Sequence, residues 1–146
     1  MTAAENKQLM QEIFAGLRTG DSRLFRQHLA PDTRLRVMGR TSWSRTLVGH
    51  ERTSAYWAYV RSIFKEASKS IVERMTAEGD LVVVESRGDN EAKDGTRYDN
   101  EYCLVFQLKD GMIVEMREYM DTAYTEQVFG PHPDPGGVAA NATVEA

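Results

Sequence analysis

The chain has 146 residues, a formal net charge of −4 and an isoelectric point near 5.4. This length suits one domain, and a hydrophobic content of 41% is enough for a packed core. The negative balance argues against general binding to nucleic acid or to an anionic membrane surface, because both carry negative charge themselves.

Cysteine and histidine usage excludes further classes. Cys103 is the single cysteine, so no internal disulfide can form, and the three histidines show no metal-site spacing. The sequence therefore predicts neither a metal nor another cofactor. The first residues do not form a basic segment followed by an apolar one, and no apolar run reaches 18 residues. A cytoplasmic location is the resulting expectation.

The N-terminal part predicts two helices. Thr2 and Glu5 have the spacing of a capping box, and the apolar residues that follow at helical spacing are Met10, Ile13, Phe14 and Leu17. Gly20 ends this helix and Asp21 can cap a second, shorter one before Pro31. The inward side chains predicted for the second helix are Leu24, Phe25, His28 and Leu29.

A short strand (33–39), a loop (40–49) and a third helix (about 50–66) are predicted next. Trp43 in the loop either stacks on a planar substrate or covers the edge of the core. Trp57 falls at helical spacing with Val60 and Phe64, which suits core packing and, as a second possibility, the lining of a cavity.

The remaining chain predicts an antiparallel sheet. Its strands are expected at about 69–77, 81–90, 97–108 and 112–120, and a helix at 122–129 follows. Asp121 precedes that helix and is a preferred N-cap residue. Helices first and antiparallel strands later indicate the α+β class. We expect one domain over residues 1–130 and a disordered tail over 131–146, which is rich in Pro, Gly and Ala.

The last predicted strand carries one carboxylate on an apolar face. Side chains alternate along a strand, so Val114, Met116, Glu118 and Met120 share that face. A three-residue loop after Leu108 would place Tyr102 opposite Glu118 and Asn100 opposite Met120. This register predicts a pocket with a dry floor and a polar end formed by Asn100, Tyr102 and Glu118. The alternative is that the face meets water near its end.

Burial would raise the pKa of Glu118 and let it exchange protons at neutral pH. A nearby cation would oppose this rise, and Arg87 is the candidate. A two-residue turn at Asp94-Gly95 puts Arg87 and Asp89 on the Glu118 face, whereas a three-residue turn puts Arg87 opposite Glu101 on the far face. The turn signals leave both possibilities open.

Several segments together resemble a known family. The segments are Gly49-His50-Glu51, Val84-Glu85-Ser86-Arg87-Gly88 and Arg117-Glu118-Tyr119-Met120-Asp121-Thr122. With the helix order, they resemble the SnoaL-like group of the ketosteroid isomerase and nuclear transport factor 2-like superfamily, over about residues 5–129. The resemblance implies a cone-shaped, curved antiparallel sheet wrapped by N-terminal helices, a cystatin-like α+β barrel. It also implies a small-molecule cavity and a homodimer.

What the resemblance implies for the reaction is less uniform. Polyketide cyclases of the group place an acid/base carboxylate on the last long strand, which Glu118 would supply. Limonene-type epoxide hydrolases use an Arg and two Asp, which Arg87, Asp89 and Glu118 would match. However, Leu35 and Val37 stand where the hydrolases have polar groups. Val37 and Phe14 likewise replace key groups of the isomerases.

The resulting hypothesis is a cofactor-independent small-molecule enzyme of the cyclase, isomerase or hydrolase type, acting by acid/base chemistry on an apolar substrate. Its predicted catalytic residues are Glu118, Arg87 and Asp89, and its predicted substrate-binding residues are Tyr102, Asn100, Met116, Trp43 and Trp57. The alternative is a non-catalytic binding domain with the same cavity. Expected partners are an apolar small molecule and a second copy of the chain, not nucleic acid or a membrane.

Overall fold

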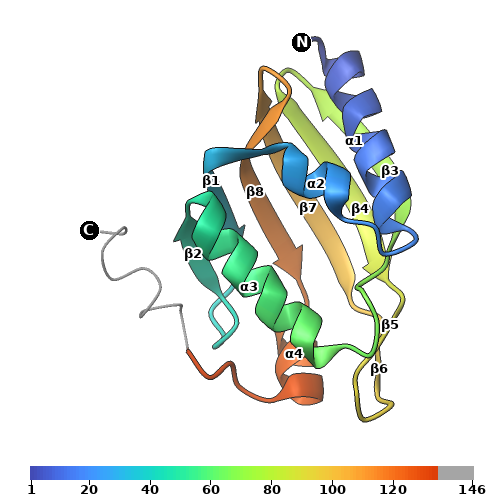
Figure 1. Cartoon of the computed structure of the whole chain (residues 1–146), viewed down its shortest axis with the longest axis vertical. Helices are drawn as coiled ribbons and strands as arrows, with labels where there is room; N and C mark the ends of the chain where they lie inside the picture. Colours follow the sequence, from blue (N-terminus) through green and yellow to red (C-terminus); the bar gives the residue numbers. More distant parts are fainter. Residues whose placement is uncertain (135–146) are drawn as a thin grey trace.

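A computed structural model describes residues 1–134 (Figure 1). Its helices are α1 (Ala3–Leu17), α2 (Arg23–Gln27), α3 (His50–Ile63) and α4 (Thr122–Phe129). Its strands are β1 (Leu29–Val37), β2 (Arg45–Val48), β3 (Ser70–Glu78), β4 (Leu81–Gly88), β5 (Asn90–Glu91), β6 (Arg97–Tyr98), β7 (Glu101–Lys109) and β8 (Met112–Met120).

Six strands form one curved sheet in the order β2-β1-β8-β7-β4-β3. Neighbouring strands are antiparallel except β1 and β8, which run parallel. The sheet does not close, because β2 and β3 stand at its two edges. The predicted α+β class with a curved sheet and N-terminal helices is confirmed, with the difference that the sheet is mixed.

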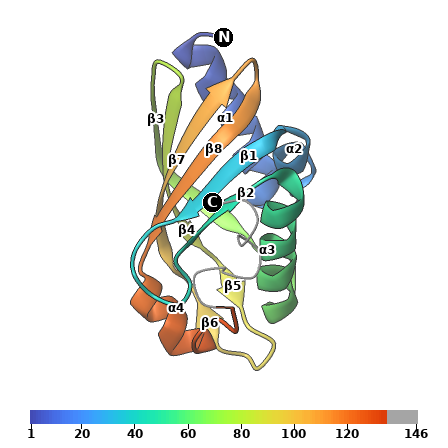
Figure 2. The same ribbon diagram turned by 90° about the vertical axis from the view of Figure 1, so that its left-hand side faces the viewer.

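The helices cover one face of this sheet. α1 packs against β3 and β4, and α3 packs against β1 and β2, while α4 lies at the end of the sheet away from the N-terminus (Figures 1 and 2). The core between these layers includes the fully buried side chains of Met10, Ile13, Leu35, Leu47, Val82, Val84, Phe106 and Ile113. None of the described helices has the length and apolar composition needed to cross a membrane.

Two predicted helix caps are confirmed. The Thr2 hydroxyl accepts a bond from the Glu5 amide at 3.1 Å, and the Glu5 carboxylate accepts one from the Thr2 amide at 3.2 Å. At α4, the Asp121 carboxylate accepts a bond from the Tyr124 amide at 3.1 Å. Asp121 is therefore engaged in capping, which satisfies an amide that the helix itself leaves unpaired.

The second helix is shorter than predicted. α2 ends at Gln27, and the chain enters β1 at Leu29, before Pro31. Leu24, expected to face inward, is 40% exposed, whereas Phe25 is buried. The predicted inward orientation is therefore wrong for Leu24 and correct for Phe25 and Leu29, although Leu29 belongs to β1 and not to the helix.

The turn between β7 and β8 also differs from the prediction. Lys109 pairs with Met112 across a two-residue turn, in which Asp110 and Gly111 both have positive φ, 51° and 77°. A bulge then shifts the register, so that Leu104 lies opposite Glu118 and Tyr102 opposite Met120. The predicted pairs are wrong by two residues, and a shift of two keeps side chains on their faces. Ile113, expected on the outer face, is buried because of the bulge.

Two strand boundaries were not predicted. β2 lies within the expected loop 40–49 and pairs with β1, with Arg45 and Leu47 buried. The expected strand 97–108 is interrupted after Tyr98, and its first part, β6, pairs with β5 in a separate small sheet. Both short strands are defined by their pairing partners rather than by an apolar pattern of their own.

Residues 130–134, here called the C-terminal strap, pack against the domain. His132 is 7% exposed, and its ring centroid lies 4.7 Å from that of Trp43 and 4.9 Å from that of Tyr59. The Trp43 indole donates to the Gly130 carbonyl at 2.9 Å. The prediction of a disordered tail is therefore wrong for residues 131–134, and the rest of that tail, 135–146, lies outside the described residues.

We expect His132→Ala to lower the free energy of unfolding by about 1–3 kcal/mol, because it removes a buried ring from its contacts with three aromatic rings. Urea unfolding at neutral pH, followed by tryptophan fluorescence, measures this loss. Pro133→Ala, at an exposed position of the same segment, is the matched control and should unfold like the parent. Equal midpoints for all three proteins would show that the strap does not stabilise the domain.

Candidate active site

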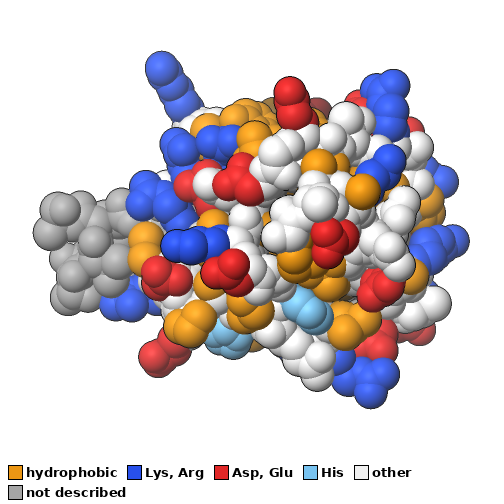
Figure 3. Space-filling model, turned by 90° about the horizontal axis from the view of Figure 1, so that it is seen from above, with side chains coloured by type: hydrophobic (Ala, Val, Ile, Leu, Met, Phe, Trp, Pro, Cys, Tyr) orange, Lys and Arg blue, Asp and Glu red, His pale blue; other side chains and the backbone are white. Residues whose placement is uncertain are grey.

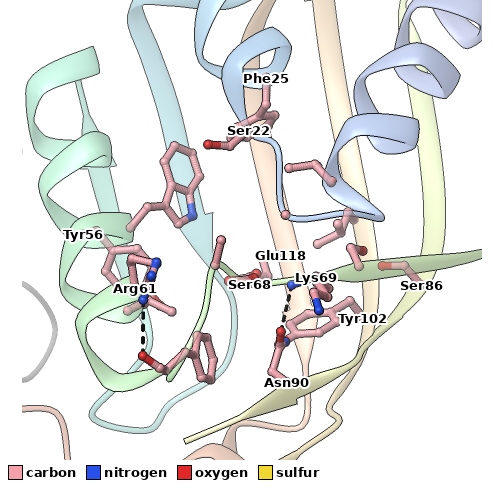
Figure 4. Close-up of a pocket in the computed structure, with 18 of the residues that line it drawn as sticks. Ser22, Phe25, Tyr56, Arg61, Ser68, Lys69, Ser86, Asn90, Tyr102 and Glu118 are labelled. Atoms are coloured by element: carbon pink, nitrogen blue, oxygen red, sulfur yellow. Dashed lines mark hydrogen bonds between the residues drawn. The ribbon is translucent and has the colours of Figure 1, made fainter. Parts of the chain in front are cut away.

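A cavity of about 670 Å³ lies between the concave face of the sheet and the helices (Figure 4). Most of its lining is apolar and aromatic, which is typical of a small-molecule site. The aromatic lining residues are Phe14, Phe25, Trp43, Tyr56, Trp57, Phe64, Tyr98, Tyr102, Phe106 and Phe129. Arg26, Arg61 and Lys69 supply cationic lining groups from α2, α3 and the start of β3.

The sheet wall of the cavity comes from alternate residues of β4, β7 and β8. Met116, Glu118 and Met120 point in from β8, and Tyr102 points in from β7. The face predicted from strand alternation is thus confirmed for Met116, Glu118 and Met120, whereas Val114 lies at the bulge and the pairing across the face differs. Ser86 completes this wall from β4, where it lies opposite Tyr102.

Glu118 is an isolated carboxylate in this wall. Within residues 1–134, no side chain or backbone amide donates a hydrogen bond to it and no cation pairs with it. Burial raises its pKa from the ordinary value of 4.5 to about 7, because the charged form loses water without gaining a partner. Near neutral pH, both the carboxylate and the carboxylic acid are therefore populated.

The Glu118 carboxylate interacts electrostatically with three tyrosines. The negative charge of Glu118 raises the pKa of Tyr56, Tyr98 and Tyr102, adding in each case to a larger effect of burial. All three hydroxyls therefore remain protonated at neutral pH and can donate hydrogen bonds. In Figure 4, Tyr56 lies on one side of Glu118 and Tyr102 on the other.

Asn100 positions one of these tyrosines and does not line the cavity. Its amide nitrogen donates to the Tyr98 hydroxyl at 2.9 Å and to the Asp121 carbonyl at 3.0 Å. The Tyr98 hydroxyl also lies 2.7 Å from the hydroxyl of Thr125 on α4. Asn100 is 2% exposed, so its side chain is enclosed in this network. The predicted position in a polar end of the pocket is wrong for Asn100.

Arg87 and Asp89 also lie outside the cavity. Arg87 stands opposite Glu101 on the outer face, with its guanidinium 3.6 Å from the Glu73 carboxylate. The Asp89 carboxylate forms a 2.6 Å ion pair with Arg97. Of the two registers left open by the sequence, the structure has the one that turns Arg87 outward. The position predicted for both residues beside Glu118 is therefore wrong.

Both tryptophans border the cavity. Trp57 packs edge-on against Phe25, with ring centroids 5.1 Å apart. Trp43 is 2% exposed and is held by the C-terminal strap. Trp43 thus covers the edge of the core, as one interpretation predicted, and it also borders the cavity, while stacking on a planar substrate stays a prediction.

Sequence reasoning missed some lining residues, including Tyr98, Phe25 and Ser86. Tyr98 has the same strand parity as Tyr102, and this parity was the available signal. Phe25 had been assigned to the core and Ser86 to a strand without a role. Within the described residues, no three His, Cys, Asp or Glu side chains gather as metal ligands would.

Comparison with known proteins places the chain in a family. A family model described as a SnoaL-like domain matches residues 10–116. The chain belongs to the SnoaL-like domain family. No curated protein matches it.

Solved structures of similar proteins share the SnoaL-like fold. A Jannaschia sp. CCS1 protein, provisionally described as a SnoaL-like polyketide cyclase, is 22% identical with a TM-score of 0.72, over 90% of this chain and 95% of its own. Bal32a, from a soil-derived mobile gene cassette, is 21% identical with a TM-score of 0.74, over 87% and 97%. TerC, crystallised with polyporic acid, is 21% identical with a TM-score of 0.70, over 84% and 95%.

The pKa of Glu118 predicts a pH-dependent stability. Because the folded-state pKa is raised from 4.5 to about 7, the wild type loses stability as the pH rises through this window, by up to about 3 kcal/mol. Glu118→Gln cannot ionise and avoids this loss. We expect the variant to be more stable than the wild type at pH 8 and similar at pH 4.5.

Urea unfolding of both proteins at the two pH values measures this difference. Glu115→Gln is the control, because Glu115 lies on the outer face of the same strand and pairs with Arg34 and Arg117. A constant difference between wild type and Glu118→Gln across the pH range would contradict a raised pKa.

Proposed function

We propose that this SnoaL-like protein is a cofactor-independent enzyme that moves a proton on an apolar small molecule, with Glu118 as general acid/base. The observation that carries the proposal is the unpaired carboxylate in an aromatic cavity, with a pKa of about 7. A group that titrates near the working pH is present in both forms and can accept and return a proton.

The proposed step is enolisation. The Glu118 carboxylate takes a proton from a carbon next to a carbonyl group; the electron pair of the C–H bond forms a C=C bond, and the π pair of the carbonyl group moves to its oxygen. A tyrosine hydroxyl beside Glu118 donates a hydrogen bond to the negative oxygen that develops. Tyr102 and Tyr56 are the candidates, since both line the cavity and the Tyr98 hydroxyl is already engaged by Asn100 and Thr125. The Glu118 acid then returns the proton to another carbon of the substrate, or the enolate carbon attacks a second carbonyl carbon of the substrate and the Glu118 acid protonates the alkoxide that forms.

Cyclases and isomerases both use such a step, so the proposal favours these two reaction classes over epoxide hydrolysis. The epoxide-opening set implied by the resemblance needs Arg87 and Asp89 beside Glu118, and both side chains lie outside the cavity. The structural neighbours add support, since one is described as a polyketide cyclase and another was crystallised with polyporic acid. We therefore propose a cyclase- or isomerase-type reaction.

The test uses 2-tetralone, an aromatic ketone with acidic protons at C1, in deuterated buffer. We expect the wild type to accelerate deuterium incorporation at C1, with a rate that rises with pH through about 7 as Glu118 ionises. Glu118→Gln should reduce the acceleration by about 100-fold, because general acid/base groups contribute roughly this factor. Proton NMR follows the exchange.

Glu115→Gln, altered on the outer face of β8, should exchange at the wild-type rate. Two results would contradict the proposal. One is exchange by the wild type no faster than buffer. The other is equal exchange by the wild type and Glu118→Gln.

The second candidate is a non-catalytic domain that holds an apolar ligand. The observation that favours it is the apolar character of Leu35 and Val37 on β1, both buried in the core. Such a domain would bind 2-tetralone without accelerating exchange, and Glu118→Gln would bind it at least as tightly. The exchange experiment and a binding titration of the same ketone separate the two candidates.

We also propose that the outer face of the sheet joins two copies of the chain. This face alternates basic and acidic side chains, which lets it pair with a copy of itself; they include Arg34, Arg36, Arg117, Glu85, Glu101 and Glu115. Tyr119 is 43% exposed among them, and the Nε atom of Arg117 is enclosed without a hydrogen-bond partner in the described chain. A second copy would cover the ring and supply an acceptor.

Light scattering at tens of micromolar should therefore give the mass of a dimer. Val105→Glu places a carboxylate directly opposite Arg117 in the middle of this face, where it would supply the acceptor from within the chain, and it should shift the mass to that of a monomer. Lys93→Glu, an exposed change in the β5–β6 turn, is the control. A monomeric wild type would exclude this self-association.

A further inference from the structure

Ser86 has a buried hydroxyl without a partner. The side chain belongs to β4, is 4% exposed and borders the cavity (Figure 4). Its Oγ atom makes no hydrogen bond with any described residue. Buried hydroxyl groups are normally hydrogen-bonded, because the loss of water is otherwise uncompensated. The hydrogen-bonding capacity of this hydroxyl is therefore unused at the cavity wall.

The neighbouring polar groups are already engaged. The side-chain oxygen Oδ1 of Asn90 accepts a hydrogen bond from the backbone amide of Lys69 at 2.7 Å. The Lys69 ammonium lies 3.3 Å from the Glu66 carboxylate. Across the ladder, Ser86 faces Tyr102, whose hydroxyl interacts with that of Tyr98. Ser86 is thus an enclosed lining group whose hydroxyl has no hydrogen-bond partner within the described chain.

The sheet fixes how far Ser86 lies from Glu118. Glu118 on β8 stands opposite Leu104, and Ser86 on β4 stands opposite Tyr102, with β7 between the two strands. Two strand spacings and a two-residue offset place their Cα atoms about 12 Å apart on a flat sheet, and somewhat closer on a concave one. The wall between them is occupied by Tyr102 and Leu104.

We propose that the cavity selects flat, largely apolar molecules with two oxygen functions at opposite ends, one at Glu118 and the other hydrogen-bonded by Ser86. Ser86 is then a specificity-determining residue that discriminates against ligands lacking the distal oxygen. This inference rests on the proposed function, which places the reacting end of the substrate at Glu118. It describes the substrate class of that site in more detail. On the face seen from above, acidic and basic side chains intermix without a continuous basic area (Figure 3).

The test compares two probes that differ by one hydroxyl, 2-naphthol and naphthalene-2,6-diol. The dissociation constant of each is measured by calorimetry at pH 6, with the full-length chain. We expect the wild type to bind the diol about fivefold more tightly than the naphthol, since one hydrogen bond to a neutral group contributes roughly this factor. Ser86→Ala should bind both probes equally and keep the wild-type affinity for the naphthol.

A matched pair at the same position isolates the hydroxyl. Ser86→Thr keeps an oxygen and should retain the preference for the diol, whereas Ser86→Val has nearly the same shape without it and should lose the preference. The melting temperature adds an independent readout. Ser86→Ala should melt at the wild-type temperature or a few degrees higher, because it removes an unpaired polar group from the interior.

The outcomes separate this inference from the proposed function. If the diol preference persists in Ser86→Ala and Ser86→Val, the role of Ser86 is wrong, and the exchange of 2-tetralone remains the test of Glu118. If the wild type binds both probes equally, Ser86 does not select for a distal oxygen. If the wild type binds neither probe, the apolar ligand class is wrong and the inference fails with it.

Discussion

The register of β8 against its two neighbours decides what the cavity contains. A bulge after the β7–β8 turn allows Ile113 to enter the core, while Met116 and Glu118 keep the inward orientation that strand alternation gives them. Without that bulge, inward positions on β8 would run from Met112 through Val114, and Ile113 would face outward. The bulge therefore buries an isoleucine in the core and leaves the far end of the same strand free to present a carboxylate to the cavity.

Burial of Glu118 without a partner opposes folding, since a carboxyl group with a pKa near 7 is destabilised whenever it is charged. The surrounding aromatic side chains do not relieve this, because burial and the charge of Glu118 together keep the three tyrosines neutral. A fold retains such a group where proton exchange is useful, and the hydroxyls around it can donate to an anion only while they are protonated. Ser86, also unpaired, adds a second destabilising group to the same wall.

The sequence predicted which face of the sheet a side chain occupies better than it predicted which residues pair across neighbouring strands. Parity along a strand depends only on the alternation of side chains, so Met116, Glu118 and Tyr102 were placed correctly on the inner face despite a wrong pairing. The pairing depends on turn length, and the two-residue turn with its bulge is not distinguishable from a three-residue loop by composition. The predicted position of Arg87 was wrong for the same reason, because one additional residue in the turn moves its side chain to the other face of the sheet. Local signals that need no partner, such as the caps at Thr2 and Asp121, were correct. The strap was missed because Pro and Gly content does not reveal that His132 meets three aromatic rings.

The sequence predicted Arg87 as a cation beside Glu118. The cation that acts on a tyrosine of this site is Arg45 instead. Arg45, 8% exposed on β2, lies 5.4 Å from the centre of the Tyr56 ring, and its guanidinium donates to the carbonyls of Trp43, Ser42 and Asp134. Its positive charge opposes the rise in the pKa of Tyr56 that burial and Glu118 cause. The charge of Asp134 acts on the same guanidinium, and Arg45 influences the site through its effect on Tyr56 rather than through an ion pair with Glu118. The strap holds this arrangement through the Asp134 carbonyl, so residues at the end of the described chain contribute to the electrostatics of a site built on the sheet.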